Sequence, residues 1–228
     1  MCNIRDLWFT EDVKTKYTIM KNIAINKEVQ SALTPSGVLE DLLEGNQRFT
    51  NNNLQSADYN ALVKDTVGGQ FPKAVVLSCI DSRVPVEQVF DQTIGDIFVA
   101  RVAGNFENTD ILGSLEYSCA VAGSKLILVL GHESCGAVKA ACDGVELGNI
   151  TAMLANITPA VKEASKDFEE GVNSSNKDFV DKTVALNVKL TIERIREKSS
   201  ILSELESDNK IKIVGGVYSL QTGKVSIL

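Results

Sequence analysis

The sequence is poor in histidine and in aromatic residues. Among its 228 residues there is one histidine, His132, so any chemistry that needs an imidazole must use that side chain. Aromatic residues make up 6% and apolar residues 44% of the chain. This composition suits an ordinary α/β domain, and the length is that of one domain with one good-sized core.

A basic surface and a long apolar run are also missing. The chain carries 23 Lys and Arg against 30 Asp and Glu, a formal net charge of −7. Nucleic acids and anionic membranes bind basic surfaces, so neither is expected as a partner. No apolar run approaches the roughly 20 residues that cross a bilayer, and residues 1–30 lack the continuous apolar segment of a secretory signal. We therefore expect a cytoplasmic protein that acts on a small molecule.

Disulfide bonds are not expected. The chain has an odd number of cysteines without the density of a disulfide scaffold: Cys2, Cys79, Cys119, Cys135 and Cys142. We expect reduced thiols, some of which could bind a metal. Cys119 has apolar neighbours and is expected to be a small buried hydrophobe; we assign Cys142 in the same way and expect Cys2 to be exposed.

The chain divides into two regions. Residues 1–33 are predicted to form an N-terminal arm, in which Met20 is a candidate alternative start, and residues 34–228 a single α/β domain. The domain opens with a helix signal at Thr34-Pro35. Apolar residues at helical spacing follow: Val38, Leu39, Leu42, Leu43 and Phe49. They predict an amphipathic helix, after which we expect a polar loop.

Apolar, β-branched runs alternate with helix-like segments along the rest of the chain. The runs are "AVVLSC" (74–79), "DIFVARVAG" (96–104) and "KLILVLGH" (125–132). Their continuous apolarity predicts a mostly parallel central sheet with helices on both faces. A long helix is expected over about 175–200, and residues 210–228 predict two short strands that form an antiparallel C-terminal edge.

The reactive residues fall at the ends of these strands. Cys79 ends the first run, Arg101–Asn105 the second and His132 the third. In an open parallel sheet the ligand crevice lies outside the carboxyl ends of the strands. We therefore expect these residues to meet at one edge of the sheet.

A metal site is the chemistry that this edge best supports. His132 and Cys135 are three residues apart across a strand-to-helix turn, where Gly131 and Gly136 allow a tight backbone. Cys79 approaches from the neighbouring strand end. Two thiolates and an imidazole suit zinc, and three protein ligands leave the fourth tetrahedral position open, as in catalytic sites.

An acidic and a basic residue follow the first cysteine. Asp81 and Arg83 lie two and four residues after Cys79, so in an extended chain all three side chains share a face. A carboxylate beside the metal could close the open position, but a bidentate pair with Arg83 would turn it toward metal-bound water. A surface ion pair worth about 0–1 kcal/mol is the alternative, and it does not explain the pair's place at a strand end.

Three motifs resemble those of a known family. "CIDSRVP" (79–85), "RVAGN" (101–105) and "GHESCGA" (131–137) are similar, in order and spacing, to motifs of the β-class carbonic anhydrases. The resemblance runs from about Thr34 to Leu228. It implies a zinc enzyme that interconverts carbon dioxide and bicarbonate, built on a mostly parallel sheet and assembled as a homodimer or tetramer.

The resemblance also implies roles for individual residues. Cys79, His132 and Cys135 become the ligands of one zinc ion per chain. Asp81 and Arg83 become a dyad that orients the zinc-bound hydroxide for attack on carbon dioxide.

The plant-like subgroup of the family supplies a candidate substrate pocket. Gln70 stands where that subgroup has a glutamine that hydrogen-bonds the substrate, nine residues before the first ligand cysteine. Phe98 and Tyr117 match its pocket aromatics, and Ala103 stands where those enzymes often have valine. The backbone N–H of Gly136 is a further candidate donor.

The sequence alone leaves other hypotheses for this site open. A Cys–His pair could act as nucleophile and base, or zinc could be structural, with Asp81 as a closed fourth ligand. A related hydrolase that acts on CS2 shares the same ligand set. The other subgroup has a tryptophan three residues before the first ligand, at a regulatory bicarbonate site; this chain has Val76 there, so that site is not expected.

Overall fold

The structure is a computed structural model that describes residues 23–228. Of the predicted arm, residues 1–22, including Cys2 and Met20, lie outside the described residues. The domain boundary after residue 33 stays a prediction.

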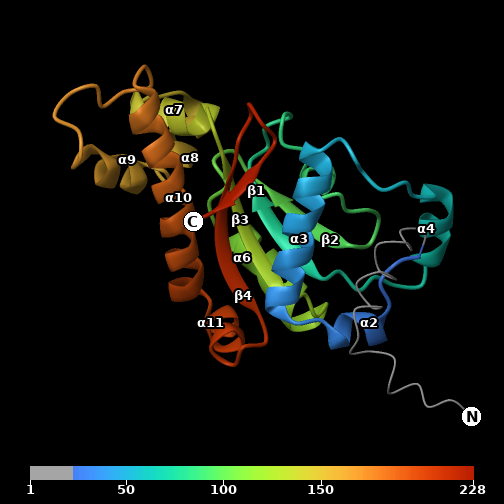
Figure 1. Cartoon of the computed structure of the whole chain (residues 1–228). Helices are drawn as coiled ribbons and strands as arrows, with labels where there is room; N and C mark the ends of the chain where they lie inside the picture. The colour runs from blue at the N-terminus through green and yellow to red at the C-terminus, as the bar shows by residue number, and fades with distance from the viewer. Residues whose placement is uncertain (1–22) are drawn as a thin grey trace, which may run out of the picture.

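The described residues form one twisted five-stranded sheet (Figure 1). Its spatial order is β2-β1-β3-β4-β5. The strands are β1 (Ala74–Ser78), β2 (Ile97–Arg101), β3 (Leu126–His132), β4 (Lys212–Tyr218) and β5 (Val225–Ile227). The first four are parallel and β5 runs antiparallel to β4. The predicted parallel sheet with an antiparallel C-terminal edge is therefore confirmed.

Helices cover both faces of this sheet, with α3 on one side and α10 on the other (Figure 1). The longer ones are α3 (Pro35–Thr50), α6 (Thr109–Glu116), which continues into the π-helix η2 (Tyr117–Val121), and α10 (Lys177–Lys198). The short ones are α2 (Lys27–Ala32), α4 (Tyr59–Asp65), α5 (Val86–Val89), α7 (Gly136–Cys142), α8 (Gly148–Leu154), α9 (Thr158–Ser165) and α11 (Ser200–Ser207). No helix within residues 23–228 has both the length and the apolarity of a membrane span.

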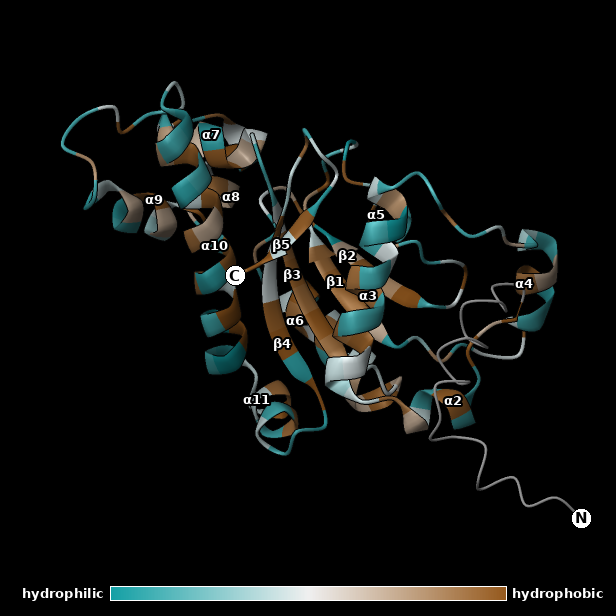
Figure 2. Cartoon of the chain, viewed as in Figure 1, coloured by the Kyte–Doolittle hydropathy of each residue, from teal (hydrophilic) through white to brown (hydrophobic). Residues whose placement is uncertain are grey.

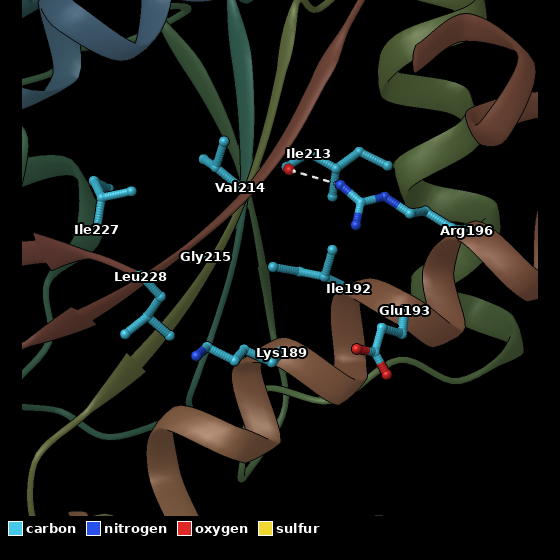
Figure 3. Close-up of a pocket in the computed structure, with 9 residues that line it drawn as sticks. All are labelled: Lys189, Ile192, Glu193, Arg196, Ile213, Val214, Gly215, Ile227 and Leu228. Atoms are coloured by element: carbon cyan, nitrogen blue, oxygen red, sulfur yellow. Dashed lines mark hydrogen bonds between the residues drawn. The ribbon is translucent and has the colours of Figure 1, made fainter. Parts of the chain in front are cut away.

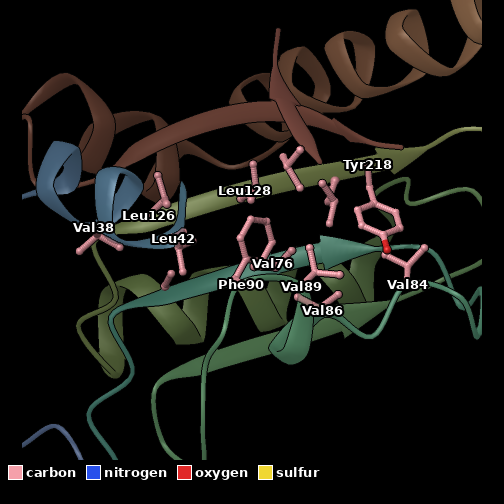
Figure 4. Packing of buried hydrophobic residues seen from close by; sticks show 13 residues of the cluster. Val38, Leu42, Val76, Val84, Val86, Val89, Phe90, Leu126, Leu128 and Tyr218 are labelled. Atoms are coloured by element: carbon pink, nitrogen blue, oxygen red, sulfur yellow. The ribbon is translucent and has the colours of Figure 1, made fainter. Parts of the chain in front are cut away.

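Successive side chains of β1 belong to two different apolar layers, because side chains alternate across a strand. Val76 packs with Leu42 and Phe90 in the layer under α3 and α5 (Figure 4). Val75 belongs to the opposite layer, with Leu115 of α6 and residues of α10 and α11. Figure 2 shows the result: the central strands are brown throughout, whereas the helices carry teal on their outer sides. Burial on both faces explains why the strands are continuously apolar.

Several short helices were not predicted. The segment expected to be a polar loop contains α4, whose first turn is capped by the Asp58 carboxylate accepting from the Ala61 N–H at 3.0 Å. The expected long helix ends at Lys198, and α11 follows it after Ser199. Helices of seven or eight residues carry too few apolar positions to show a clear period, so only their capping residues could have revealed them.

The described part of the predicted arm lies against its own domain. Gln30 of α2 is buried and donates to the carbonyl oxygens of Pro72 and Ala122, both at 2.8 Å. The Ala24 N–H donates to the Asp65 carboxylate at 2.9 Å. These bonds fasten residues 23–33 to the amino-terminal side of the sheet, at the opposite end from the strand ends that carry the cysteines and histidine.

Candidate metal centre

Three buried side chains meet at the carboxyl ends of β1 and β3. Cys79 follows β1, His132 is the last residue of β3, and Cys135 directly precedes α7. The two strands are neighbours in the sheet, with Ser78 beside Leu130 in the register. The three candidate ligand atoms lie within 4.8 Å of one another. The sheet thus brings together the set that the spacing predicted.

The histidine presents one particular nitrogen to the cluster. Its Nδ1 lies 2.8 Å from the carbonyl oxygen of Glu133, which can only accept, so Nδ1 carries the proton. The Nε2 atom is buried and has no hydrogen-bond partner among the described residues. An unpaired buried nitrogen is costly, and a metal ion would satisfy it. His132 therefore has the tautomer that a metal-binding histidine needs.

The spacing of the sulfur atoms fits zinc. The Sγ atoms of Cys79 and Cys135 are 3.9 Å apart. Tetrahedral zinc with Zn–S bonds of about 2.3 Å holds two sulfurs about 3.8 Å apart. The apolar cluster around them includes Phe106 and Ile157. Three soft or borderline donors in a dry setting match the chemistry of a zinc centre.

The two thiols already share negative charge. The pKa of Cys79 is lowered to about 4, chiefly because the Cys135 thiol donates to its sulfur, against the opposing effect of burial. The same contact raises the pKa of Cys135, whose proton is held between the two sulfurs. The backbone N–H of Gly104 also donates to Cys79 Sγ at 3.4 Å. The pair therefore carries one thiolate at neutral pH, and this negative charge favours the binding of a cation.

The Asp81–Arg83 pair forms through a turn, which corrects the expected extended geometry. The strand stops at Ser78, and the Val84 N–H donates to the Asp81 carbonyl at 3.1 Å, closing a tight turn. Within it the Arg83 N–H and Nε both donate to Asp81 Oδ1 at 2.9 Å, and Nη2 donates to Oδ2 at 2.7 Å. The turn brings both the backbone N–H and the guanidinium of Arg83 to the Asp81 carboxylate. An extended chain would not place both groups there.

The Asp81 carboxylate lies beside the ligand cluster, not in it. Its Oδ2 is 3.8 Å from His132 Nε2, whereas the group of mutually close ligand atoms contains only the two sulfurs and the imidazole. Hydrogen bonds from the Arg83 side chain lower the pKa of Asp81 to about 2. The carboxylate is therefore ionised at neutral pH and held by Arg83 on both oxygens.

Arg101 was missed as a site residue. It ends β2, and its Nε donates to the Cys79 carbonyl at 2.8 Å while Nη2 donates to the Asp81 carbonyl at 2.6 Å. Both bonds fix the backbone that carries a candidate ligand and the carboxylate. The sequence placed Arg101 at the sheet edge within "RVAGN", and a charged residue ending an apolar strand was the available signal.

The candidate pocket residues divide into two groups. Ala103 precedes the Gly104 that contacts Cys79. Gly136 follows Cys135 and faces open space, since a Cβ there would meet no atom within 4 Å beyond its chain neighbours and its own helix backbone. Both are at the cluster.

Phe98, Tyr117 and Gln70 are not brought to the cluster within the chain. Phe98 pairs with Val75, four residues before Cys79, which is about 13 Å along the strand at roughly 3.3 Å per residue. The Phe98 and Tyr117 rings, 6.2 Å apart, line a groove of about 740 Å³ along the outer strand β2. No candidate ligand lines that groove, and Gln70 is exposed.

A second groove lies toward the opposite edge of the sheet from β2, between α10 and the β4–β5 pair (Figure 3). Arg196 borders it, donating to the Ile213 carbonyl at 3.3 Å and pairing with Glu206 at 2.7 Å. None of the three candidate ligands lines this groove, so it is separate from the metal centre.

Comparisons with family models, with curated proteins and with solved structures all identify the same family. Residues 74–225 match the family model described as carbonic anhydrase. Carbonic anhydrase 2 of Mycobacterium tuberculosis is 35% identical over 199 residues, which cover 83% of this chain and 91% of that protein. The Coccomyxa β-carbonic anhydrase, solved in complex with acetazolamide, has a TM-score of 0.66 at 27% identity, covering 83% of this chain and 86% of that one. A structure of two tetrameric β-carbonic anhydrases from Sordaria macrospora has a TM-score of 0.65 at 23% identity, covering 83% and 93%.

Proposed function

This chain belongs to the β-carbonic anhydrase family, and we propose that it hydrates carbon dioxide reversibly on a zinc ion held by Cys79, His132 and Cys135. That it is a carbonic anhydrase, and so a lyase, follows from the family. The metal, its ligands and the roles of the surrounding residues are the proposal.

One observation carries the proposal most directly. The buried Nε2 of His132, which has no partner among residues 23–228, lies next to two sulfurs at zinc spacing, while the Asp81 carboxylate is held away from them. Zinc bound there would supply a Lewis acid that brings the pKa of water to about 7. A structural site would use a fourth protein ligand, and Arg83 keeps Asp81 from that place.

The chain's own residues then position the reacting water and the substrate. Asp81, ionised and fixed by Arg83, accepts a hydrogen bond from the water that attacks, and so sets the direction of its lone pair. Ala103 and the exposed Gly136 border the open side, where the Gly136 N–H can donate to a bicarbonate oxygen.

A second copy of the chain would complete the pocket. The Phe98–Tyr117 groove lies along the outer strand β2, and Tyr117 is 54% exposed. Large apolar side chains, Tyr59, Val63 and Val67, are also exposed just before Gln70. A homodimer, or a tetramer as in the Sordaria proteins, would cover these residues and could bring Gln70, Phe98 and Tyr117 to the neighbouring metal centre. A cytoplasmic location stays a prediction.

Elemental analysis together with stopped-flow carbon dioxide hydration tests the proposal. We expect one zinc per chain and a hydration rate that falls on chelation and returns with zinc. A chelator-resistant activity would point to a Cys–His thiol enzyme. Bound zinc without any carbon dioxide hydration activity would indicate that the metal is structural.

A further inference from the structure

Asn187 is a polar residue in the middle of a buried helix face. It lies on α10, flanked by the buried Val184 and Val188, and is itself 1% exposed. Its Nδ2 donates to the carbonyl oxygen of Gly104 at 2.8 Å, across 83 residues of chain. Asn187 therefore ties α10 to the loop that follows β2.

The loop, residues 102–105, is a tight turn that contacts the candidate metal centre through Gly104. The Asn105 N–H donates to the Val102 carbonyl at 2.9 Å, and Gly104 has a φ of 84°, the left-handed value that a type II turn needs at its third position. The Gly104 N–H points at Cys79 Sγ, 3.4 Å away. Gly104 is thus held between the Asn187 amide and a candidate zinc ligand.

Close packing leaves this arrangement little freedom. A Cβ on Gly104 would lie 2.4 Å from Ile157 Cδ1, so the turn backbone is pressed against the apolar cluster. On β3, which carries His132, a Cβ on Gly131 would lie 2.8 Å from Val188 Cγ2. Helix α10 therefore contacts the turn beside Cys79 and also the residue before His132.

The asparagine is not fully satisfied by its surroundings. Its Oδ1 is buried without a hydrogen-bond partner among the described residues, and an unpaired buried acceptor is destabilising. An apolar side chain of similar volume would avoid that cost but would leave the Gly104 carbonyl without this donor. What the amide supplies, and an apolar residue does not, is the donor that holds Gly104.

We propose that Asn187 is a positioning residue of the metal centre: by fixing Gly104, it keeps the Gly104 N–H on the Cys79 sulfur and so limits how much charge that thiolate gives to the metal. The inference rests on the proposed function, since it takes Cys79 as a zinc ligand. It extends that function to a helix residue that touches neither metal nor substrate. Partners that hold metal ligands in this way are worth about 10–100-fold in metal affinity or activity.

Cobalt(II) substitution provides the main test, because thiolate-to-cobalt charge transfer reports the charge on the sulfur. We expect the near-ultraviolet band of Asn187→Leu to move to lower energy, because the thiolate loses a hydrogen bond. We also expect about 10–100-fold weaker zinc binding in competition with a chromophoric chelator, because the loss of the positioned Gly104 turn beside Cys79 outweighs the stronger donation of the freed thiolate. Asn187→Asp, which keeps the size but replaces the donor by an acceptor, should behave in the same way.

Thr183→Val is the matched control. Thr183 lies one turn earlier on α10, is fully buried, and its hydroxyl donates to Phe179 of the same helix at 2.8 Å. Its replacement perturbs the same helix without touching the Gly104 turn. The cobalt spectrum and zinc affinity of this variant should equal those of the wild type.

A measurement on the unaltered holoprotein covers the case in which the Asn187 variants do not fold. With ¹¹³Cd in the site, an N–H···S hydrogen bond to a ligand sulfur gives a scalar coupling between the Gly104 amide proton and the metal. Absence of that coupling, or a wild-type cobalt spectrum and zinc affinity in both Asn187 variants, overturns the inference. If the wild type binds neither zinc nor cobalt, the proposed function itself fails instead.

Discussion

Arg83 donates three hydrogen bonds to the carboxylate of Asp81, one from its backbone and two from its guanidinium. The bonds engage both oxygens, and the nearer of these to the histidine is 3.8 Å from His132 Nε2. The carboxylate is thus close enough to reach the metal position but is directed elsewhere. In the proposed zinc site, this pair would decide whether the fourth metal position is open or closed.

Replacing Arg83 by alanine should close the centre. Without the guanidinium, Asp81 is free to turn onto the metal as a fourth ligand, so we expect carbon dioxide hydration to fall at least about 100-fold while one zinc per chain remains. Stopped-flow hydration and elemental analysis measure both. Arg196→Ala is the matched control, since it removes a similar bidentate pair, with Glu206, beside the separate groove. Undiminished hydration in Arg83→Ala would disprove the orienting role.

The pH response of Asp81 follows from the same pair. Its pKa of about 2 lies below the ordinary value of 3.8, so the pair stabilises the fold fully above pH 3.8 and loses that contribution as the pH falls toward 2. No step in the hydration rate between pH 5 and 9 should therefore come from Asp81. Carboxyl ¹³C NMR titration of the metal-free protein should show the low pKa, and Arg83→Ala should raise it toward 3.8.

The strands could be predicted from the sequence, but the positions of side chains in the loops could not. Apolar runs located β1, β2 and β3, and the parallel order of the strands then put Cys79 and His132 at one edge. The turn at Asp81 was missed because the periodicity of a strand says nothing about where it stops. Asn187 was missed because its partner, Gly104, lies 83 residues away and no local pattern records such a contact.

Only two of the described thiols should be needed for metal binding. Cys79→Ser and Cys135→Ser each remove a sulfur from the cluster, so zinc content should fall well below one per chain and hydration should fall with it. Cys142→Ala is the control, because the Cys142 thiol contacts the Thr183 hydroxyl, at 3.9 Å, and lies outside the group of close ligand atoms. A Cys135→Ser protein with full zinc and full activity would contradict the ligand assignment.

The ion pairs of the buried Glu107 should contribute to the stability of the fold. Glu107 is 2% exposed and accepts from Arg194 at 2.8 Å and from Lys198 at 2.9 Å. Breaking a fully buried pair costs about 3–5 kcal/mol. Because the Arg194 and Lys198 side chains are 19% and 50% exposed, Glu107→Gln should lower the free energy of unfolding in urea by less, about 1.5–3 kcal/mol. Glu163→Gln, which removes an exposed pair with Lys166, should cost only about 0–1 kcal/mol.

The stability that Glu107 contributes should also depend on pH. Burial opposes ionisation, but the two cations outweigh it and hold the pKa of Glu107 below its ordinary value of 4.5. The contribution is then complete above pH 4.5 and lost as the pH falls further, and Glu107→Gln should flatten this acid limb of the unfolding curve. Equal acid sensitivity in both proteins would show that other carboxylates control it.

Subunit complementation tests whether the pocket is shared between two copies. A Cys79→Ser chain lacks its own metal but keeps Gln70 and Tyr117, and a chain carrying Gln70→Ala and Tyr117→Ala has the reverse defect. If pocket residues act across a dimer, each mixed dimer contains one intact centre. Random pairing makes half of the dimers mixed, each with one of its two centres intact, so about a quarter of the wild-type activity should return after co-refolding.

Mixing Cys79→Ser with Arg83→Ala provides the control for that experiment. Arg83 is hydrogen-bonded to Asp81 of its own chain, and the two residues lie four and two positions after Cys79. Both defects then affect groups that a chain supplies to its own centre, so no mixed dimer contains an intact one and activity should stay at the level of the separate variants. Recovery in both mixtures would mean that the Asp81–Arg83 pair also acts across the dimer. Recovery in neither mixture would contradict a pocket shared between two copies of the chain.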